Sequence, residues 1–204
     1  MVNRLILFLP FALSLLYHEA EGNGMMRTNT EIEYKTLVTR DQFERLLKHF
    51  PVLKTVTQTN TYFDTVDRTL KALKMACRIR VSDDSIVATV KHKVDQGVME
   101  YDVDLEEFDA NVFRRDEFRR LFEEIGVSEE LIVVGNVKTV RSTVDEPLGE
   151  LCFDQNFYRV ITDYELEFEV KGDPVAGYRR FMEILELENI PYRPSISKMQ
   201  RATA

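Results

Sequence analysis

Carboxylates at alternate positions mark two short segments of the chain. Glu31 and Glu33 lie two residues apart near the start, and Glu165, Glu167 and Glu169 repeat this spacing late in the sequence. On a β-strand, residues two apart share a face and lie about 6.5 to 7 Å apart, so their carboxylates can converge on one cation. Oxygen-only ligands favour Mg²⁺ or Mn²⁺ over Zn²⁺. The spacing therefore predicts a divalent-metal site.

Basic residues alternate in the same way on other segments. Lys35 follows the first acidic pair, Arg78 and Arg80 share one segment, and Lys91 and Arg141 lie on two more. Guanidinium groups bind phosphate oxygens bidentately and lysines add point charges. This array suits a chain of phosphates better than a single carboxylate, so we expect a ligand with several phosphates.

These residues belong to segments in which charged and apolar side chains alternate, which is the pattern of a β-strand. Two further strand candidates bring the count to about eight, near the usual range for a closed barrel. The predicted strands are residues 31–35, 57–63, 77–81, 87–91, 100–105, 139–143, 148–153 and 165–169.

Three segments show the apolar spacing of an amphipathic helix instead. Thr39 and Asp173 are expected to start the first and third helix, and Gly126 is expected to end the second. The apolar stripes are Phe43, Leu46, Leu47 and Phe50; Phe118, Leu121, Phe122 and Ile125; and Tyr178, Phe181, Met182 and Leu185.

The charged strand faces are predicted to point inward. A single charged face usually lies in solvent. Here three helices must bury their stripes against the apolar faces of the strands, which leaves the charged faces to line the interior. Acids gather on the first and last strands and bases on the middle ones, whereas a solvated surface mixes both signs.

Composition limits the partners and the location. The 204 residues fit one domain, and a net charge of −8 argues against nucleic acid or an anionic membrane as partner. Cys77 and Cys152 stand in apolar runs without metal-ligand spacing, so we expect reduced core thiols in a cytoplasmic protein. A monomer or homodimer acting on a small molecule is expected.

The first residues have a different composition. Residues 5–16 are nearly all apolar, but this run is too short to span a bilayer, and the paired small residues of a signal cleavage site are missing after it. Residues 19–24 back-translate to a purine-rich stretch typical of a ribosome-binding site before Met25. We therefore expect residues 1–25 to be a non-structural leader or a mis-assigned start, and residues 26–204 to form a single domain.

The ordered set of motifs resembles the CYTH-domain proteins, or triphosphate tunnel metalloenzymes. This superfamily includes thiamine triphosphatases, class IV adenylate cyclases and fungal RNA triphosphatases. The resemblance spans residues 30–201 and implies an α+β fold, with a closed eight-stranded antiparallel β-barrel that forms a tunnel and helices packed outside. It rests on the E-x-E-x-K run of Glu31, Glu33 and Lys35, then Arg78 and Arg80, Lys91, Glu100, Arg141, Asp154, Glu165 and Glu167, and Lys198.

The resemblance also implies roles for these residues. Glu31, Glu33 and Lys35 form the expected catalytic motif. Glu169 extends the late acidic pair by one strand position and has no implied role. The implied metal ligands are Glu31, Glu33, Asp154, Glu165 and Glu167, and the implied phosphate-binding residues are Lys35, Arg78, Arg80, Lys91, Arg141 and Lys198.

The expected activity is Mg²⁺- or Mn²⁺-dependent hydrolysis of a triphosphate-containing substrate. Inorganic triphosphate, thiamine triphosphate and a nucleoside triphosphate all remain open as substrates. Two alternatives share the same motifs: a class IV-type adenylate cyclase, and a polyphosphate- or nucleotide-binding module without turnover.

Overall fold

The computed structural model describes residues 26–95 and 97–204, so the expectations for residues 1–25 lie outside the described part. Nine antiparallel strands form one sheet in the order β1-β6-β5-β4-β3-β7-β8-β9-β2. Within these described ranges, no helix is both long and apolar enough to cross a membrane. The strands are β1 (Arg27–Glu31), β2 (Glu33–Val38), β3 (Lys54–Asp64), β4 (Met75–Ser82), β5 (Ile86–Val94), β6 (Gly97–Leu105), β7 (Ile132–Glu146), β8 (Gly149–Phe157) and β9 (Thr162–Val170).

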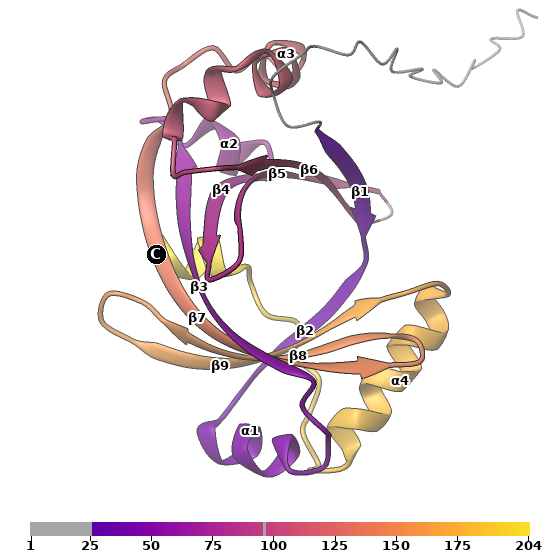
Figure 1. Cartoon of the computed structure of the whole chain (residues 1–204). Coiled ribbons are helices and arrows are strands. Elements are labelled where there is room, and N and C mark those ends of the chain that lie inside the picture. Colours follow the sequence, from indigo (N-terminus) through magenta and orange to yellow (C-terminus); the bar gives the residue numbers. More distant parts are fainter. Residues whose placement is uncertain (1–25, 96) are drawn as a thin grey trace, which may run out of the picture.

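The sheet curls strongly, and its two end strands are consecutive in the chain (Figure 1). β1 pairs with β6 and β2 pairs with β9, and only Ile32 separates them. The carbonyl of Ile32 accepts a hydrogen bond from the amide of Val170, so the change of partner occurs within one residue. The prediction of eight strands in a closed barrel is therefore confirmed only as a curled antiparallel sheet, since residues 31–35 form parts of two strands.

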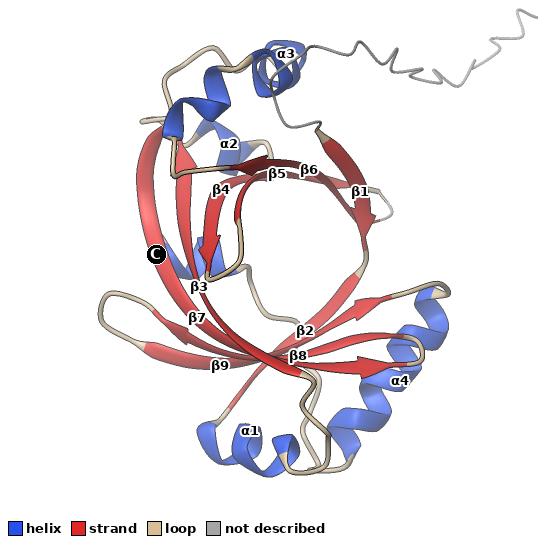
Figure 2. Ribbon diagram, in the orientation of Figure 1, coloured by secondary structure: helices blue, strands red, loops and turns tan. Residues whose placement is uncertain are grey.

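Helices cover the outer side of the curled sheet in two groups (Figure 2). One group packs on β8 and β9 and the other on β4, β5 and β6, and each builds its own apolar core. The helices are α1 (Arg40–Leu47), α2 (Thr69–Ala72), the 3₁₀ helix η1 (Ala110–Arg114), α3 (Asp116–Glu124), α4 (Pro174–Glu186) and α5 (Lys198–Ala202). The prediction that helices pack outside the sheet is confirmed for these two groups, whereas α5 packs against Tyr62 and Val137 through Met199 and lines the enclosed space.

Local signals explain the three helices that the sequence predicted. Thr39 and Gln42 form a capping box at the start of α1, and Asp173 caps α4 ahead of a proline in the first turn. Gly126 follows α3 with φ of +77°, a left-handed conformation that glycine adopts without a Cβ clash. The short elements α2, η1 and α5 were not predicted.

Strand β4 shows why the charged faces point inward. Cys77 and Ile79 are fully buried in the core beneath η1 and α3. Arg78 and Arg80 alternate with them and face the space that the sheet encloses. The apolar face of the strand thus meets the helices, as predicted from their amphipathic stripes.

Candidate active site

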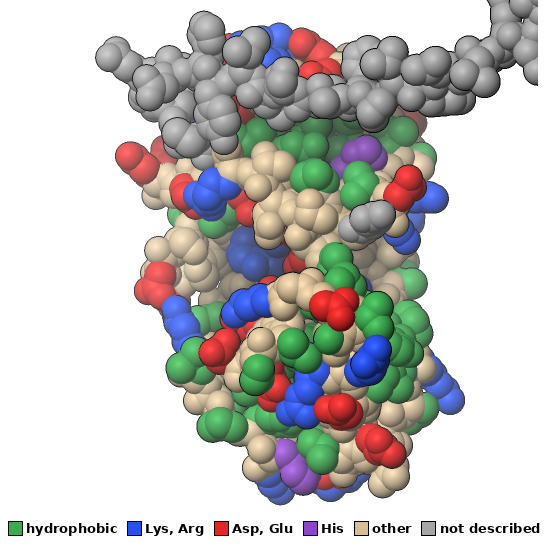
Figure 3. All heavy atoms as spheres, turned by 90° about the vertical axis from the view of Figure 1, so that its right-hand side faces the viewer, with side chains coloured by type: hydrophobic (Ala, Val, Ile, Leu, Met, Phe, Trp, Pro, Cys, Tyr) green, Lys and Arg blue, Asp and Glu red, His purple; other side chains and the backbone are tan. Residues whose placement is uncertain are grey.

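The curled sheet encloses a cavity of about 710 Å³ with a charged wall. The charged lining residues are Glu31, Glu33, Glu100, Glu150, Glu167, Glu169, Lys35, Lys71, Lys74, Lys91, Lys93, Lys198, Arg78, Arg80 and Arg141. These nine bases and six acids give the wall a formal charge of about +3, whereas the whole chain carries −8. Figure 3 shows Lys and Arg side chains set back in a hollow of the surface. A cavity of this sign attracts anions in spite of the acidic chain.

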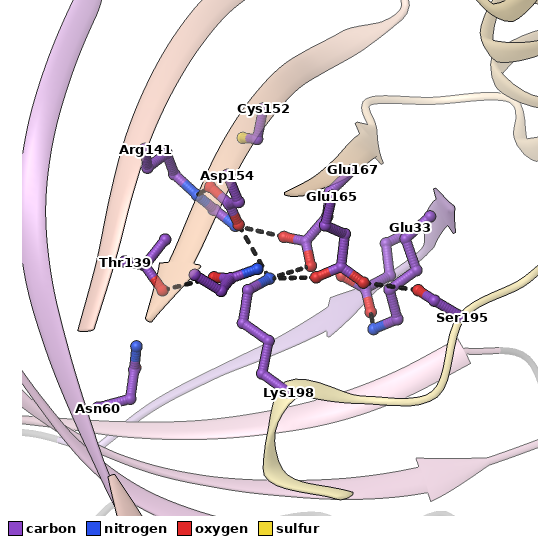
Figure 4. A network of polar contacts seen from close by, with 12 residues as sticks. Glu33, Asn60, Thr139, Arg141, Cys152, Asp154, Glu165, Glu167, Ser195 and Lys198 are labelled. Carbon is purple, nitrogen blue, oxygen red and sulfur yellow. Dashed lines mark hydrogen bonds and ion pairs between the residues drawn. The ribbon is translucent and has the colours of Figure 1, made fainter. Parts of the chain in front are cut away.

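The ammonium group of Lys198 lies among three buried carboxylates (Figure 4). Its Nζ atom is 2.9 Å from Asp154, 2.7 Å from Glu165 and 2.6 Å from Glu167. One oxygen of each carboxylate lies within 4.8 Å of the others. Burial alone would raise the pKa of Glu167, but Lys198 and Arg141 hold it well below its usual range. Glu167 is therefore ionised beside a cationic nitrogen.

Arg141 on β7 is the second base of this cluster. Its guanidinium binds Asp154 bidentately, with N–O distances of 2.8 and 2.7 Å, and it also contacts Glu167 and Glu169. Arg141 and Asp154 are paired in the β7–β8 register, so strand pairing itself brings them together. Burial alone would lower the pKa of Arg141, but the neighbouring carboxylates hold it well above its usual value. This network fixes the charges of β7, β8 and β9 relative to one another.

Side chains of the C-terminal segment orient Glu165. Arg201 on α5 donates to its two oxygens at 3.0 and 2.7 Å, and the Ser195 hydroxyl donates at 2.6 Å. Arg201 also lies 2.9 Å from Asp163. Lys198 and Arg201 are three residues apart, so one turn of α5 presents both to the same carboxylate. The sequence analysis missed Arg201 and Ser195, although this spacing of two bases was the available signal.

Another set of carboxylates forms a row across three adjacent strands. Glu33 on β2 is paired in register with Glu169 on β9, which is paired with Glu150 on β8. Like charges directly opposite one another destabilise a sheet. Burial raises the pKa of Glu169, Arg141 opposes this, and the charges of Glu31 and Glu150 add to the rise. Negative charge therefore exceeds positive charge along this row.

The carboxylates of the E-x-E-x-K run have different partners because β1 pairs with β6 whereas β2 pairs with β9. Glu33 contacts Lys35 on its own strand. Glu31 accepts a hydrogen bond from Lys91 Nζ at 2.6 Å, and Lys91 also contacts Glu100 on β6. Neither Glu100 nor Glu150 was among the predicted ligands. Glu100 belonged to the ordered set of motifs, while Glu150 was marked only by its place in a predicted strand.

Arg78 and Arg80 on β4 form no ion pair with any described residue. Arg80 Nε donates to the Asn60 side chain at 3.0 Å, while Arg78 Nε is buried without a hydrogen-bond partner among the described atoms. Burial and the positive charges of Arg78 and Arg141 lower the pKa of Arg80 to about 10. A buried donor without a partner costs about 1–3 kcal/mol. Both guanidinium groups are thus available to an anion in the cavity.

The structure brings most of the predicted site residues to one cavity. Asp154 and Glu165 are the exceptions, since both are fully buried behind Lys198 and do not line the cavity. The predicted residues that line it are Glu31, Glu33, Lys35, Arg78, Arg80, Lys91, Arg141, Glu167 and Lys198. Their proximity is observed, while their roles in binding and catalysis stay predictions.

Sequence and structure comparisons place the chain among known proteins. The profile of the CYTH domain matches residues 29–203. "Putative triphosphatase YjbK" of Bacillus subtilis (strain 168) is 28% identical over 185 residues, which cover 86% of this chain and 95% of that protein.

Two solved structures share the fold. The crystal structure of a "putative adenylate cyclase" from Bacillus halodurans is 30% identical with a TM-score of 0.77, covering 85% of this chain and 97% of the other. A "putative adenylyl cyclase" from Hippeastrum, for which a dominant triphosphatase activity is stated, is 28% identical with a TM-score of 0.64, covering 83% and 93%. Because the profile matches most of the chain and includes the whole charged cavity, the chain belongs to the CYTH domain family.

Proposed function

We propose that this chain hydrolyses a phosphoanhydride bond of a triphosphate with the help of a divalent cation. One observation carries the proposal: a cavity of net positive charge borders, at Glu167 and Lys198, a buried cluster of three carboxylates gathered around a cationic nitrogen. The triphosphatase name of the Bacillus subtilis relative and the activity stated for the Hippeastrum protein support it.

We further propose that β1 and β2 act as one bent strand that closes the sheet into a tunnel. The two strands are joined by a single residue and pair with the two ends of the remaining sheet. Counting them as one strand restores the predicted eight. A tunnel would shield the reacting phosphates from bulk water, which strengthens electrostatic contacts inside it.

The donors at the acidic wall fit a divalent cation such as Mg²⁺ or Mn²⁺. All are carboxylate oxygens, and those of Asp154, Glu165 and Glu167 already surround the Lys198 ammonium at short distances. We propose that these three residues hold the cation, with Glu31 and Glu33 as further carboxylates of the same cavity. Ser195 and Arg201 would keep Glu165 oriented, as outer-shell partners do for metal ligands.

The bases would hold the phosphate chain. Arg78 and Arg80 have no carboxylate partner to give up, so they bind phosphate without breaking an existing ion pair. Lys35, Lys91, Arg141 and Lys198 would exchange part of their carboxylate contacts for phosphate oxygens. A bound divalent cation supplies charge neutralisation and lowers the pKa of a coordinated water.

The chain's own residues would supply position and charge in this reaction. Phosphoryl transfer needs little protein acid–base chemistry when charge on the phosphate oxygens is stabilised. No histidine is among the described residues that line the cavity. His49 lies on the outside, 2.8 Å from Glu188, so it is not placed to act as a base.

The cavity favours hydrolysis over cyclisation. A cyclase must hold the ribose and base of ATP, and proteins commonly hold bases by stacking them on aromatic rings. Tyr62 is the one aromatic residue lining the described cavity, and only 3% of its surface is exposed.

We also propose a cytoplasmic location. The thiols of Cys77 and Cys152 are buried and form no disulfide, which fits a reducing compartment.

A substrate panel tests the proposed function. Inorganic triphosphate, thiamine triphosphate, ATP and GTP are each incubated with Mg²⁺ or Mn²⁺, and both phosphate release and cyclic nucleotide are measured. We expect phosphate release and no cyclic nucleotide. Cyclic AMP as the main product would establish the cyclase alternative, and tight binding without either product would establish a binding module.

A further inference from the structure

Three lysines line the same cavity but lie outside the predicted phosphate-binding set. Lys71 belongs to α2, Lys74 precedes β4, and Lys93 is on β5. All three side chains are exposed, and none forms an ion pair with any residue in the ranges 26–95 and 97–204. Lys35, Lys91 and Lys198, which line the same cavity, are each paired with carboxylates. The difference shows that the three lysines do not serve to balance carboxylates of the fold.

Strand register places Lys74 and Lys93 at the end of the basic row, and Lys71 on the preceding helix α2 lines the same cavity. The backbone amide of Lys93 donates to the carbonyl of Lys74. Two residues further along β4, Ala76 lies opposite Lys91 in the β4–β5 register. Arg78 and Arg80 follow on the same face of β4. Each two-residue step covers about 7 Å. The unpaired positive charges thus form an extended row rather than a compact patch.

A row of positive charge fits a linear polyanion. The two guanidinium groups without carboxylate partners stand at one end of the row, and the lysines continue it beyond them. A nucleoside at the lysine end would find no exposed aromatic face, since Tyr62 is buried. A thiamine group is itself cationic and would be repelled by three unpaired ammonium groups. Additional phosphate groups are the part of a ligand whose charge complements these lysines.

We propose that Lys71, Lys74 and Lys93 form an outer subsite for phosphates beyond the third, and that the substrate class is linear inorganic polyphosphate. The proposal rests on the proposed function, because the inner bases must hold the first phosphates. It adds a prediction of its own: affinity rises when the chain is longer than three phosphates.

Equilibrium binding to the Mg²⁺-loaded full-length protein tests the subsite. Calorimetry compares inorganic tripolyphosphate with inorganic tetraphosphate for the native protein and for the double variant Lys71→Gln/Lys93→Gln. Lys74 is left intact because its φ of 58° makes substitution a backbone change as well. The control is Lys54→Gln/Lys171→Gln, which removes the same charge from exposed lysines outside the cavity.

The ratio of the two dissociation constants decides the outcome. We expect tetraphosphate to bind more tightly than tripolyphosphate to the native protein and to the control. In Lys71→Gln/Lys93→Gln we expect this preference to shrink by about twofold to thirtyfold, as for two exposed charge contacts. Equal binding of both anions to the native protein, or an equal loss for both in the variant, would overturn the subsite.

Failure of the subsite can be distinguished from failure of the proposed function. Phosphate release from tripolyphosphate, measured in parallel, reports on the proposed function alone. Hydrolysis with no preference for the longer chain overturns the subsite and keeps the triphosphatase. A length preference that depends on Lys71 and Lys93 supports the subsite even if no phosphate is released.

Discussion

Two walls of the cavity differ in whether their charged side chains form ion pairs. The acidic wall is formed by Glu167 on β9, which lines the cavity, and by Asp154 on β8 and Glu165 on β9, which are buried behind it, and each of these carboxylates contacts at least one base. The basic wall on β4 contains Arg78 and Arg80, which have no ion-pair partner among the described residues. The acidic wall is therefore compensated by ion pairs within the fold, while neither guanidinium group of the basic wall has an ion pair among the described residues.

The difference separates stability from function. Breaking a buried ion pair strands its partner and destabilises the protein. Arg80 is different, because burial and the positive charges of Arg78 and Arg141 lower its pKa, so its removal strands no ion-pair partner and relieves repulsion. Substitutions on the acidic wall should therefore weaken folding and activity together, whereas substitution of Arg80 should weaken activity more than folding.

Removal of the divalent cation has the largest expected effect. Turnover of tripolyphosphate should fall to background in excess chelator and return on addition of Mg²⁺ or Mn²⁺, because the proposed reaction draws on the cation for charge neutralisation. Phosphate release over a metal titration measures this. Full activity after exhaustive chelation would show that the acidic wall is purely structural.

Arg80→Ala tests the basic wall. Turnover should fall by on the order of a hundredfold to a thousandfold, as when one charge-stabilising donor is removed from an active site. The unfolding free energy should fall by at most about 1–3 kcal/mol, because the buried Asn60 oxygen loses its donor, while the lowered pKa of Arg80 indicates that removal of the charge itself is not costly. Kinetics and urea unfolding are measured side by side.

Arg179→Ala on α4 provides the control for Arg80→Ala. Arg179 is exposed and lies outside the cavity, so it should change neither quantity. The loss of unfolding free energy in Arg80→Ala is compared with the rise in activation free energy calculated from its turnover. If the two are equally large, the proposed contrast between the two walls is wrong.

Glu167→Gln tests the acidic wall. The variant leaves Lys198 and Arg141 with less compensation in a buried site, so the unfolding free energy without metal should fall by about 3 kcal/mol. Urea unfolding in chelator measures it. Glu150→Gln is the matched control, because Glu150 lines the same cavity but forms no ion pair with a described residue. Equal losses in both variants would contradict the assignment of Glu167 to a compensated network.

The sequence predicted the inward charged faces because alternation and amphipathic helices are local signals. Alternation alone assigns one face of β4 to Cys77 and Ile79 and the other face to Arg78 and Arg80. The split of residues 31–35 into β1 and β2 was not predictable in this way, since a change of pairing partner leaves alternation intact. The strand count was wrong for this reason.

Partners within the site were less predictable than its composition. The position of α5 decides which carboxylates Lys198 contacts, namely Asp154, Glu165 and Glu167. This position depends on tertiary packing, which local sequence patterns do not show. Gly135 permits close docking, because a Cβ there would lie 3.2 Å from the Ala202 side chain. The sequence thus listed the charges of the cavity but not which of them are already paired.

Glu169→Gln has the smallest expected effect and sharpens the comparison, because Glu169 belongs to the acidic side but is not fully compensated. Its pKa is raised in the folded protein, so its contribution to stability is greatest below the unfolded pKa and is lost as the pH rises through the folded pKa. At neutral pH the ionised group is therefore a cost. The side chain is 33% exposed and has one contact to Arg141 at 3.0 Å, so solvent limits that cost. We expect Glu169→Gln to raise the unfolding free energy by less than about 1 kcal/mol at neutral pH, and to show no gain at pH 4. Urea unfolding at both pH values in chelator measures this. A loss of stability at neutral pH would mean that Arg141 compensates Glu169 as fully as it does Asp154, and the row of Glu33, Glu169 and Glu150 would then carry no excess charge for a cation to balance.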